Sequence, residues 1–238
     1  MNCVVCRQPE PVPLMAVGGR DYWRCERCQA RFLDPGQQPD RSAEKQEYDR
    51  HQNDPGDAGY RGFLNRLAEP LLERLPSGSR GLDYGCGPGP ALAAMLREAG
   101  HHMAVYDPIY APDEDALTSR YEFITCTEVV EHFHDPAGEF ERLVSLLEPG
   151  GWLGIMTRFQ TDDARFAGWH YRRDPTHVVF YRPATFEWLG QHLGLAVETR
   201  PPDVVLALKK DPVMRHHRAC SDRVRSESVR SWRPGRPD

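Results

Sequence analysis

A glycine-rich turn near residue 85 constrains the fold of this chain more than any other feature. A short apolar run, residues 80–84, leads into three glycines at alternate positions, and a helical pattern begins directly afterwards at Ala91. The glycines are Gly85, Gly87 and Gly89. Glycine lets the backbone approach a ligand closely, and the free N–H groups that begin a helix point toward the same place. The pattern predicts a ligand-binding turn in an α/β fold, although a tight turn without a ligand has the same composition.

Strand-like and helix-like segments alternate from residue 60 to residue 210. The expected strands are 80–84, 103–106, 123–126, 152–157, 196–199 and 204–208, and the expected helices are 63–75, 91–99, 136–147 and 185–193. This alternation predicts an α/β domain with a doubly wound, mostly parallel, Rossmann-like sheet. The last two strands are close in sequence, which suggests an antiparallel hairpin at one edge. Pro70 is expected to interrupt or kink the first helix.

The residues around the turn favour a nucleoside over a dinucleotide. Pro90 occupies the position where a dinucleotide fingerprint has glycine or alanine. The second strand ends at Asp107, and a carboxylate there can accept hydrogen bonds from both hydroxyls of a ribose. The sequence therefore predicts nucleoside binding without recognition of a pyrophosphate.

Four ordered motifs make the prediction more specific. They occupy residues 82–90, 106–107, 125–132 and 147–153. In this order they resemble the class I S-adenosylmethionine-dependent methyltransferases, particularly the small-molecule methylases of ubiquinone biosynthesis, over residues 60–210. The resemblance implies that the glycines cradle the methionine part of the cofactor, that Asp83 helps to hold the loop and the cofactor's amino group, and that Asp107 holds the ribose.

The chain departs from that family between Asp107 and Ile124. Members usually have a further helix and strand there, with an acidic residue near the adenine, whereas this chain has only residues 108–123. We therefore expect the third strand of the family to be missing and the sheet to have six strands. Adenine contacts would then come from Cys126 and Thr127, or from the loop 108–115. The expected cofactor contacts are Asp83, Gly85, Cys86, Gly87, Gly89, Asp107, Pro108, Cys126, Thr127 and Glu128.

Candidate catalytic residues follow the strands on the same edge of the sheet. Methyl transfer needs an acceptor held in line, exclusion of water and, for some acceptors, removal of a proton. Glu131 and His132 follow the third expected strand, and His170 and His177 lie in the aromatic segment 169–181. Histidine suits proton transfer near neutral pH. The alternative hypotheses are that Glu131 and His132 only order their loop, and that the aromatic segment only packs into the core.

Two pairs of cysteines predict a structural metal site at the N-terminus. Cys3 and Cys6 form one pair, and Cys25 and Cys28 form the other. This spacing is typical of a zinc ribbon, in which four thiolates close the coordination sphere and leave no catalytic position. Unliganded cysteines or a redox pair are the alternatives. Nearby aromatic and basic residues would suit either nucleic-acid stacking or packing against the enzyme domain, and we favour packing; they are Tyr22, Trp23, Arg24, Arg27, Arg31 and Phe32.

These features divide the chain into four parts. We expect a zinc-ribbon module at 1–35, a linker at 36–59 with a short charged helix at 42–50, a methyltransferase domain at 60–210, and a basic, disordered tail at 211–238. No apolar run is long enough to cross a bilayer, and the N-terminus lacks secretory features, so a cytoplasmic location is expected. The sequence leaves the oligomeric state open.

The predicted function is therefore methylation of a small or medium-sized metabolite, with S-adenosylmethionine and structural Zn²⁺ as cofactors. One alternative is an RNA methyltransferase that uses the zinc module for docking, which the net charge of −5 disfavours. Another is a non-catalytic protein that binds the cofactor or uses the zinc module for interactions.

Overall fold

The computed structural model describes residues 1–50 and 54–211. A central sheet of six strands runs in the order β5 (His102–Tyr106), β4 (Arg80–Tyr84), β6 (Tyr121–Thr127), β7 (Leu147–Met156), β10 (Val204–Lys209) and β9 (Leu195–Arg200). The first four are parallel, and β10 is antiparallel to both of its neighbours. The predicted α/β class, the six strands and the edge hairpin are confirmed. The predicted basic tail lies outside the described residues.

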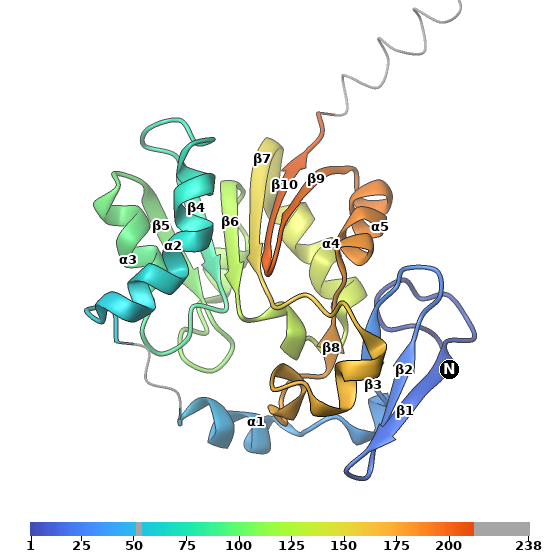
Figure 1. The fold of residues 1–238 in the computed structure, drawn as a ribbon. Coiled ribbons are helices and arrows are strands. Elements are labelled where there is room, and N and C mark those ends of the chain that lie inside the picture. The colour runs from blue at the N-terminus through green and yellow to red at the C-terminus, as the bar shows by residue number, and fades with distance from the viewer. Residues whose placement is uncertain (51–53, 212–238) are drawn as a thin grey trace, which may run out of the picture.

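Helices cover both faces of this sheet (Figure 1). On one face lie α2 (Ala58–Leu72) and α3 (Ala91–Glu98), and on the other lie α4 (Pro136–Leu146) and α5 (Pro183–Leu193). Side chains alternate along a strand, so neighbouring residues belong to different cores. Phe123 packs with the α2–α3 cluster, whereas Ile124 packs with the α4–α5 cluster. This two-sided burial is what makes the fold doubly wound.

The helix α2 continues through Pro70, so the expected interruption does not occur. Leu67 and Leu71 are fully buried and contact the position of Gly154 on β7. Burial of two leucine side chains contributes several kcal/mol, of the order of ~3–6. That gain offsets the hydrogen bond that Pro70 cannot donate.

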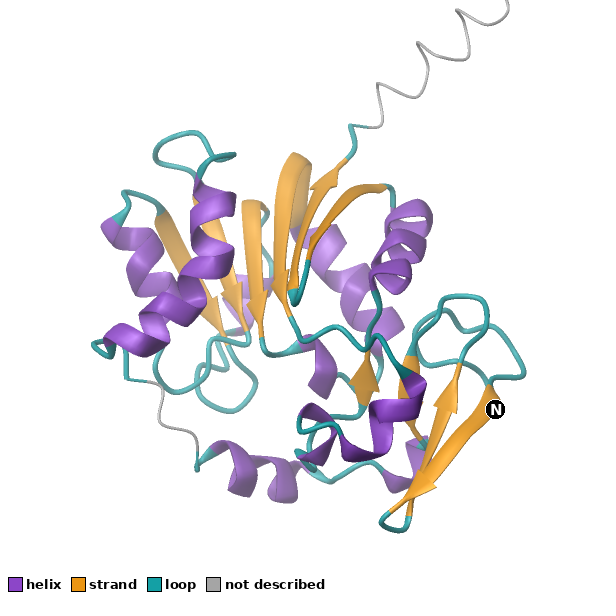
Figure 2. Cartoon of the chain, in the orientation of Figure 1, coloured by secondary structure: helices purple, strands orange, loops and turns teal. Residues whose placement is uncertain are grey.

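A second, smaller sheet contains the N-terminal strands (Figure 2). Its order is β1 (Val12–Val17), β2 (Arg20–Arg24), β3 (Arg31–Leu33) and β8 (Val179–Phe180), and every pairing is antiparallel. The fourth strand, β8, comes from the segment between β7 and α5, which the sequence pattern did not indicate. The division into 1–35 and 60–210 stays a prediction, and the two parts share this sheet.

A short helix, α1 (Arg41–Tyr48), follows the small sheet close to the expected position. Asp40 caps its N-terminus by accepting a hydrogen bond from the amide of Ala43 at 2.9 Å. Arg41, Glu44 and Tyr48 of α1 line the main cavity. The segment expected to be a linker therefore forms part of a site.

Candidate active site

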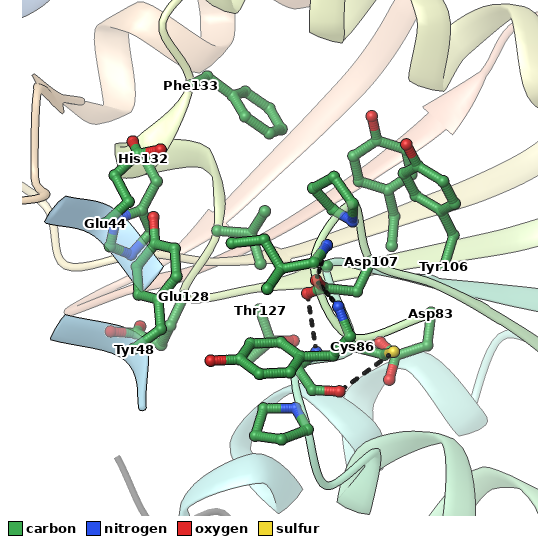
Figure 3. Close-up of a pocket in the computed structure, with 18 of the residues that line it drawn as sticks. Glu44, Tyr48, Asp83, Cys86, Tyr106, Asp107, Thr127, Glu128, His132 and Phe133 are labelled. Carbon is green, nitrogen blue, oxygen red and sulfur yellow. Dashed lines mark hydrogen bonds between the residues drawn. The ribbon is translucent and has the colours of Figure 1, made fainter. Parts of the chain in front are cut away.

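The main cavity lies at the carboxyl ends of β4, β5 and β6 and has a volume of about 850 Å³. Ligands bind at this edge of open α/β sheets because the loops after the strands meet there. Most of the expected site residues line it: Asp83, Gly85, Cys86, Gly87, Gly89, Asp107, Pro108, Thr127, Glu128, His132, His170 and His177. Figure 3 shows Tyr48, Glu128 and His132 on one side of the cavity and Asp83 and Asp107 on the other.

We name the two sides of the cavity after residues that they contain. The glycine side consists of Asp83, residues 85–89 and Asp107, and the histidine side consists of Glu128, His132, Tyr171 and His177. The last two belong to the cap segment, which we define as residues 158–181, between β7 and α5. Tyr171 and His177, which belong to the aromatic segment 169–181 of the sequence analysis, line the cavity at this edge of the sheet.

The turn on the glycine side depends on residues that tolerate left-handed backbone. Gly85 and Gly87 have φ values of +76° and +64°. The amides of Gly85 and Cys86 both donate to the carbonyl of Tyr106, at 2.7 and 3.1 Å, which ties the turn to the end of β5. A Cβ atom on Gly85 would lie 2.4 Å from a methyl group of Val129. Position 85 therefore requires glycine for both its backbone conformation and its close packing.

Asp107 is held in place by backbone amides. Its Oδ2 atom accepts a hydrogen bond from the amide of Gly87 at 3.1 Å, and its Oδ1 atom accepts from the amides of Ile109 and Tyr110 at 2.8 and 2.9 Å. Each carboxylate oxygen has two acceptor positions, so Oδ2 keeps capacity for a further donor. The carboxylate is fixed against the glycine turn, where a ligand hydroxyl group could reach it.

Asp83 places a second carboxyl group on the glycine side. Its Oδ1 atom accepts a hydrogen bond from the hydroxyl of Thr125 at 2.7 Å. Burial raises the pKa of Asp83 to about 6, because removal from water disfavours the charged form. A cationic ligand group beside it would restore the carboxylate.

The cavity also presents an unpaired polar atom. Thr127 lines the cavity, and its buried hydroxyl has no hydrogen-bond partner among the described residues. A buried hydroxyl without a partner costs free energy, which a bound ligand would recover. The glycine turn, two carboxyl groups and this hydroxyl together fit an adenosyl ligand with an amino group and a ribose.

Two expected site residues do not line the cavity. Cys126 is fully buried in the same hydrophobic cluster as Phe140 of α4. Alternation along β6 explains this, because the side chain of Cys126 faces the α4 core while that of Thr127 reaches the cavity. The side chain of Cys126 is therefore not part of the cavity lining, and cofactor contact by this residue stays a prediction. Glu131 is also fully buried and does not line the cavity.

Glu131 instead organises a buried acidic pair with Glu128. The hydroxyl of Tyr171 donates to Glu131 Oε1 at 2.5 Å and lies 3.2 Å from Glu128 Oε2. Burial and the charge of Glu131 raise the pKa of Glu128 to about 9, so Glu128 is protonated at neutral pH. Glu128 has a φ of +53°, a conformation that non-glycine residues rarely adopt. Glu128 therefore combines a strained backbone with a raised carboxyl pKa at the wall of the cavity.

His132 and His177 lie with their rings against each other, with centroids 4.7 Å apart. The Nδ1 atom of His132 is 3.1 Å from the carbonyl of Thr176, and that of His177 is 2.7 Å from the carbonyl of Tyr171. A carbonyl only accepts, so both Nδ1 atoms carry a proton. The Nε2 atom of His132 lies 4.0 Å from Oε1 of Glu131, and that of His177 lies 3.8 Å from Oδ2 of Asp174. Burial lowers the pKa of His132, which favours the neutral form. His170 also lines the cavity but is exposed at its rim.

Among the described residues, side-chain spacing identifies two groups that could hold a metal ion. One donor atom from each of Glu131, His132 and His177 lies within 4.8 Å of the others. The same spacing holds for the four cysteine Sγ atoms of the N-terminal module, all of which are buried.

The cysteine group fits zinc closely. The Sγ atoms of Cys3 and Cys28 are 3.6 Å apart, and those of Cys6 and Cys25 are 3.5 Å apart. Tetrahedral zinc with Zn–S bonds of 2.3 Å separates its sulfurs by about 3.8 Å. The two pairs form matching turns: the amide of Arg7 donates to the carbonyl of Cys3 at 2.9 Å, and that of Gln29 donates to Cys25 at 3.0 Å. Arg7 and Gln29 both have positive φ values.

Sequence reasoning missed the contribution of α1. The ring of Tyr48 stacks edge-on against His132 with centroids 5.2 Å apart, and the carboxylate of Glu44 lies 2.8 Å from Nε2 of His134. The signal available in the sequence was one tyrosine in a helix of mostly charged and polar residues. That signal is weak, because a polar helix between two modules is usually a solvated linker.

Comparison with known proteins identifies the family. A family model described as "Methyltransferase domain" matches residues 48–200. The chain belongs to this methyltransferase family. The match confirms the family expected from the four motifs, and it extends to Tyr48 at the end of α1.

Relatives of the methyltransferase domain include curated enzymes of known pathways. The ubiquinone biosynthesis O-methyltransferase of Xylella fastidiosa is 31% identical over 161 residues, which are 54% of this chain and 65% of the relative. The protein of the same name from Aeromonas salmonicida is 26% identical over 152 residues, which are 50% of this chain and 64% of the relative. The chain thus spans slightly less than two thirds of the length of these relatives.

A solved structure supports the fold of the methyltransferase domain. The 1,6-didemethyltoxoflavin-N1-methyltransferase of Burkholderia thailandensis, solved with S-adenosylhomocysteine, matches with a TM-score of 0.51 and 18% identity. The match covers 84% of this chain and 100% of that chain. Within the described residues, no helix is long and apolar enough to cross a membrane.

Proposed function

We propose that this protein transfers a methyl group from S-adenosylmethionine to a small or medium-sized metabolite. The observation that carries the proposal is the division of one cavity into a glycine side and a histidine side. The glycine side offers groups that suit an adenosyl ligand. The histidine side offers proton-accepting nitrogen atoms and a buried carboxyl group that suit an acceptor. The names of the curated relatives and of the toxoflavin-type enzyme agree with this chemistry.

The residues of the glycine side would hold the cofactor, whose sulfonium supplies the methyl group. Asp107 would accept hydrogen bonds from the ribose hydroxyls, and Asp83 would face the amino group. Thr127 would donate or accept through its unpaired hydroxyl. Orientation by several fixed groups is the main contribution that a protein makes to a displacement of this kind.

On the histidine side, the Nε2 atom of His132 or His177 would take a proton from the acceptor. Their Nδ1 atoms are held by backbone carbonyls, which fixes the orientation of both rings. Glu128 would donate a hydrogen bond to the acceptor, since its raised pKa keeps it protonated. The Tyr171 hydroxyl and Glu131 hold this arrangement in place.

The RNA alternative loses support because three of the six residues that suggested it, Tyr22, Arg31 and Phe32, are buried. Tyr22 is 1% exposed and packs on Phe166 and Phe180, and Arg31 is 2% exposed and bonded to Asp163. Aromatic and basic side chains bind nucleic acid only where they are accessible. The zinc module therefore offers few stacking groups to an RNA.

A combined binding and transfer experiment tests the proposed function. Calorimetry with S-adenosylmethionine is expected to show one ligand per chain, and radiolabelled methyl groups are expected to enter the small-molecule fraction of a cell extract. Nuclease treatment should leave this label unchanged. Label that disappears with nuclease would favour RNA, and absence of cofactor binding would favour a non-catalytic protein.

We expect His132→Ala and His177→Ala each to lower turnover about 100-fold, in the range of a lost general base. Their affinity for S-adenosylmethionine should stay within about twofold of wild type, because both lie on the histidine side. Transfer of the methyl label to the small-molecule fraction measures turnover, and calorimetry measures the affinity for S-adenosylmethionine. His102→Ala, at an exposed position on β5, is the control. Unchanged turnover in both variants would remove histidine from the mechanism.

Cofactor affinity should depend on pH through Asp83. A ligand ammonium group prefers the carboxylate, so below the pKa of about 6 binding must release a proton. Affinity is expected to fall about tenfold per pH unit below 6 and to be flat above 7. Calorimetry between pH 5 and 8 in buffers of different ionisation enthalpy measures this proton. Asp83→Asn should bind weakly with no such dependence; a similar slope in that variant would assign the proton elsewhere.

A further inference from the structure

The cysteine module, residues 1–33, contacts the cap segment at residues that neighbour Tyr171 and His177 of the histidine side. Strand β3 pairs with β8, so that Arg31 lies opposite Phe180 and Phe32 lies opposite Val179. Strand β8 begins two positions after His177. The module is therefore part of the scaffold directly behind a cavity residue.

Val178 is held from two directions. Its carbonyl accepts a hydrogen bond from the amide of Leu33 in the module at 2.8 Å, and its amide donates to the carbonyl of Glu131 at 2.8 Å. His177 precedes this residue in the chain. The backbone position of His177 is thus fixed by β3 on one side and by the loop after β6 on the other.

A buried ion pair adds a second connection. The guanidinium of Arg31 donates to both oxygens of Asp163, at 2.9 and 2.8 Å, and its side chain is 3% exposed. Asp163 begins the 3-10 helix Asp163–Gly168 of the cap segment and also accepts from Arg182 at 3.1 Å. Neighbouring guanidinium groups lower the pKa of Asp163, with the Arg31 hydrogen bond as the largest cause. A bidentate pair of this kind fixes orientation as well as distance.

Aromatic packing and two further hydrogen bonds join the same parts. Tyr22 of β2 contacts Phe166 with ring centroids 5.0 Å apart, and its hydroxyl accepts from Arg172 at 3.4 Å. Arg20 donates to the carbonyl of Pro175 at 3.1 Å. Arg172 and Pro175 lie within the stretch from Tyr171 to His177. Contacts from the module therefore reach the cap segment along most of its length.

The glycine side is built differently. In the described part of the chain, no hydrogen bond, ion pair or ring contact joins residues 1–33 to residues 85–89 or to Asp107. The turn and Asp107 are held by β4, β5 and the loop after β5. The two sides of the cavity thus depend on different parts of the molecule.

We infer that the cysteine module is a positioning element for the methyl acceptor, acting through β3–β8 pairing and the Arg31–Asp163 pair on Tyr171 and His177. This inference rests on the proposed function, because the proposed function places the methyl acceptor on the histidine side. Arg31 is a positioning residue and touches no reacting atom. Loss of its contact should loosen the histidine side and leave cofactor binding unchanged.

The test compares Arg31→Ala with Arg27→Ala in the full chain with its metal retained. Arg27 is an exposed arginine of the same module that donates to Gln8. For Arg31→Ala we expect amide hydrogen exchange across residues 163–178 to rise about tenfold or more. We also expect the His177 ring resonance to move toward that of a solvated histidine. The affinity for S-adenosylhomocysteine should stay within twofold, zinc content should be unchanged, and Arg27→Ala should match wild type.

Asp163→Asn gives a milder test if Arg31→Ala is unstable, since it keeps the shape and removes the charge. Unchanged exchange and an unchanged His177 resonance in either variant would overturn the inference, because the cap segment would then be set by its own domain. A parallel loss of S-adenosylhomocysteine binding would also overturn it, since the module would then support the whole fold. If wild-type protein fails to bind S-adenosylhomocysteine, the proposed function fails, while exchange and resonance still report on the coupling.

Discussion

Asp107→Ala is expected to weaken S-adenosylmethionine binding about 100-fold or more. The variant lacks the carboxylate that we propose as the acceptor for the ribose hydroxyls, and hydrogen bonds to a charged group contribute about 1.5–3 kcal/mol each. A loss of ~3 kcal/mol corresponds to about a 100-fold change in Kd. It also removes the acceptor for the amides of Gly87, Ile109 and Tyr110, so the turn itself loosens. Calorimetry beside circular dichroism separates lost binding from lost fold.

Asp115→Ala is the matched control for that variant. Asp115 is an exposed carboxylate in the same connection between β5 and β6, and it does not line the cavity. The Asp115→Ala variant should bind the cofactor as wild type does. That result would show that the effect of Asp107→Ala comes from the position of its carboxylate and not from the loss of one negative charge. Normal cofactor binding by Asp107→Ala would show that the ribose is held elsewhere.

Cys28→Ser is expected to release the metal from the N-terminal module. Zinc content should fall from about one per chain to about a tenth or less, because three thiolates bind far more weakly than four and the binding free energy of such sites is of the order of 10 kcal/mol. The melting temperature should fall with it, since a module of this size has little core of its own. Metal analysis and thermal unfolding measure both effects.

Cys86→Ser provides the control for the cysteine chemistry. Cys86 is also buried but lies on the glycine side, so the variant should keep its zinc. Wild-type protein purified without zinc, with all four thiols of the module titratable, would contradict the metal assignment.

The sequence predicted the central sheet well because its strands follow one clear pattern. Most are short runs with buried residues next to a glycine, proline or acidic residue, and β4 has the predicted bounds Arg80–Tyr84. The missing third strand followed from the family resemblance together with the length of the connection, because residues 108–123 are too few for the family's further helix and strand. The cavity residues were predictable for the same reason, since loops after parallel strands meet at one edge.

Features that depend on distant pairing were not predictable. Strands β3 and β8 have three and two residues, too few for a periodic signal, and they meet only in the folded chain. The sequence did not show which of Cys126 and Thr127 faces the cavity, because neighbouring residues of a strand lie on opposite faces. The position of α1 over the cavity depends on contacts of Tyr48 and Glu44 with residues far along the chain.

The shared small sheet limits how this protein could be dissected or recombined. A fragment beginning after residue 35 would leave Val179 and Phe180 without β3 and would uncover Phe166 and Phe180, which are at most 1% exposed in the intact chain. An unpaired strand edge beside exposed aromatic rings promotes self-association. A swapped ribbon from another protein would need to match the β8 edge and the Asp163 carboxylate as well as the four-thiolate spacing. A change of the N-terminal ribbon would therefore require matching residues in a segment more than a hundred residues away in the sequence.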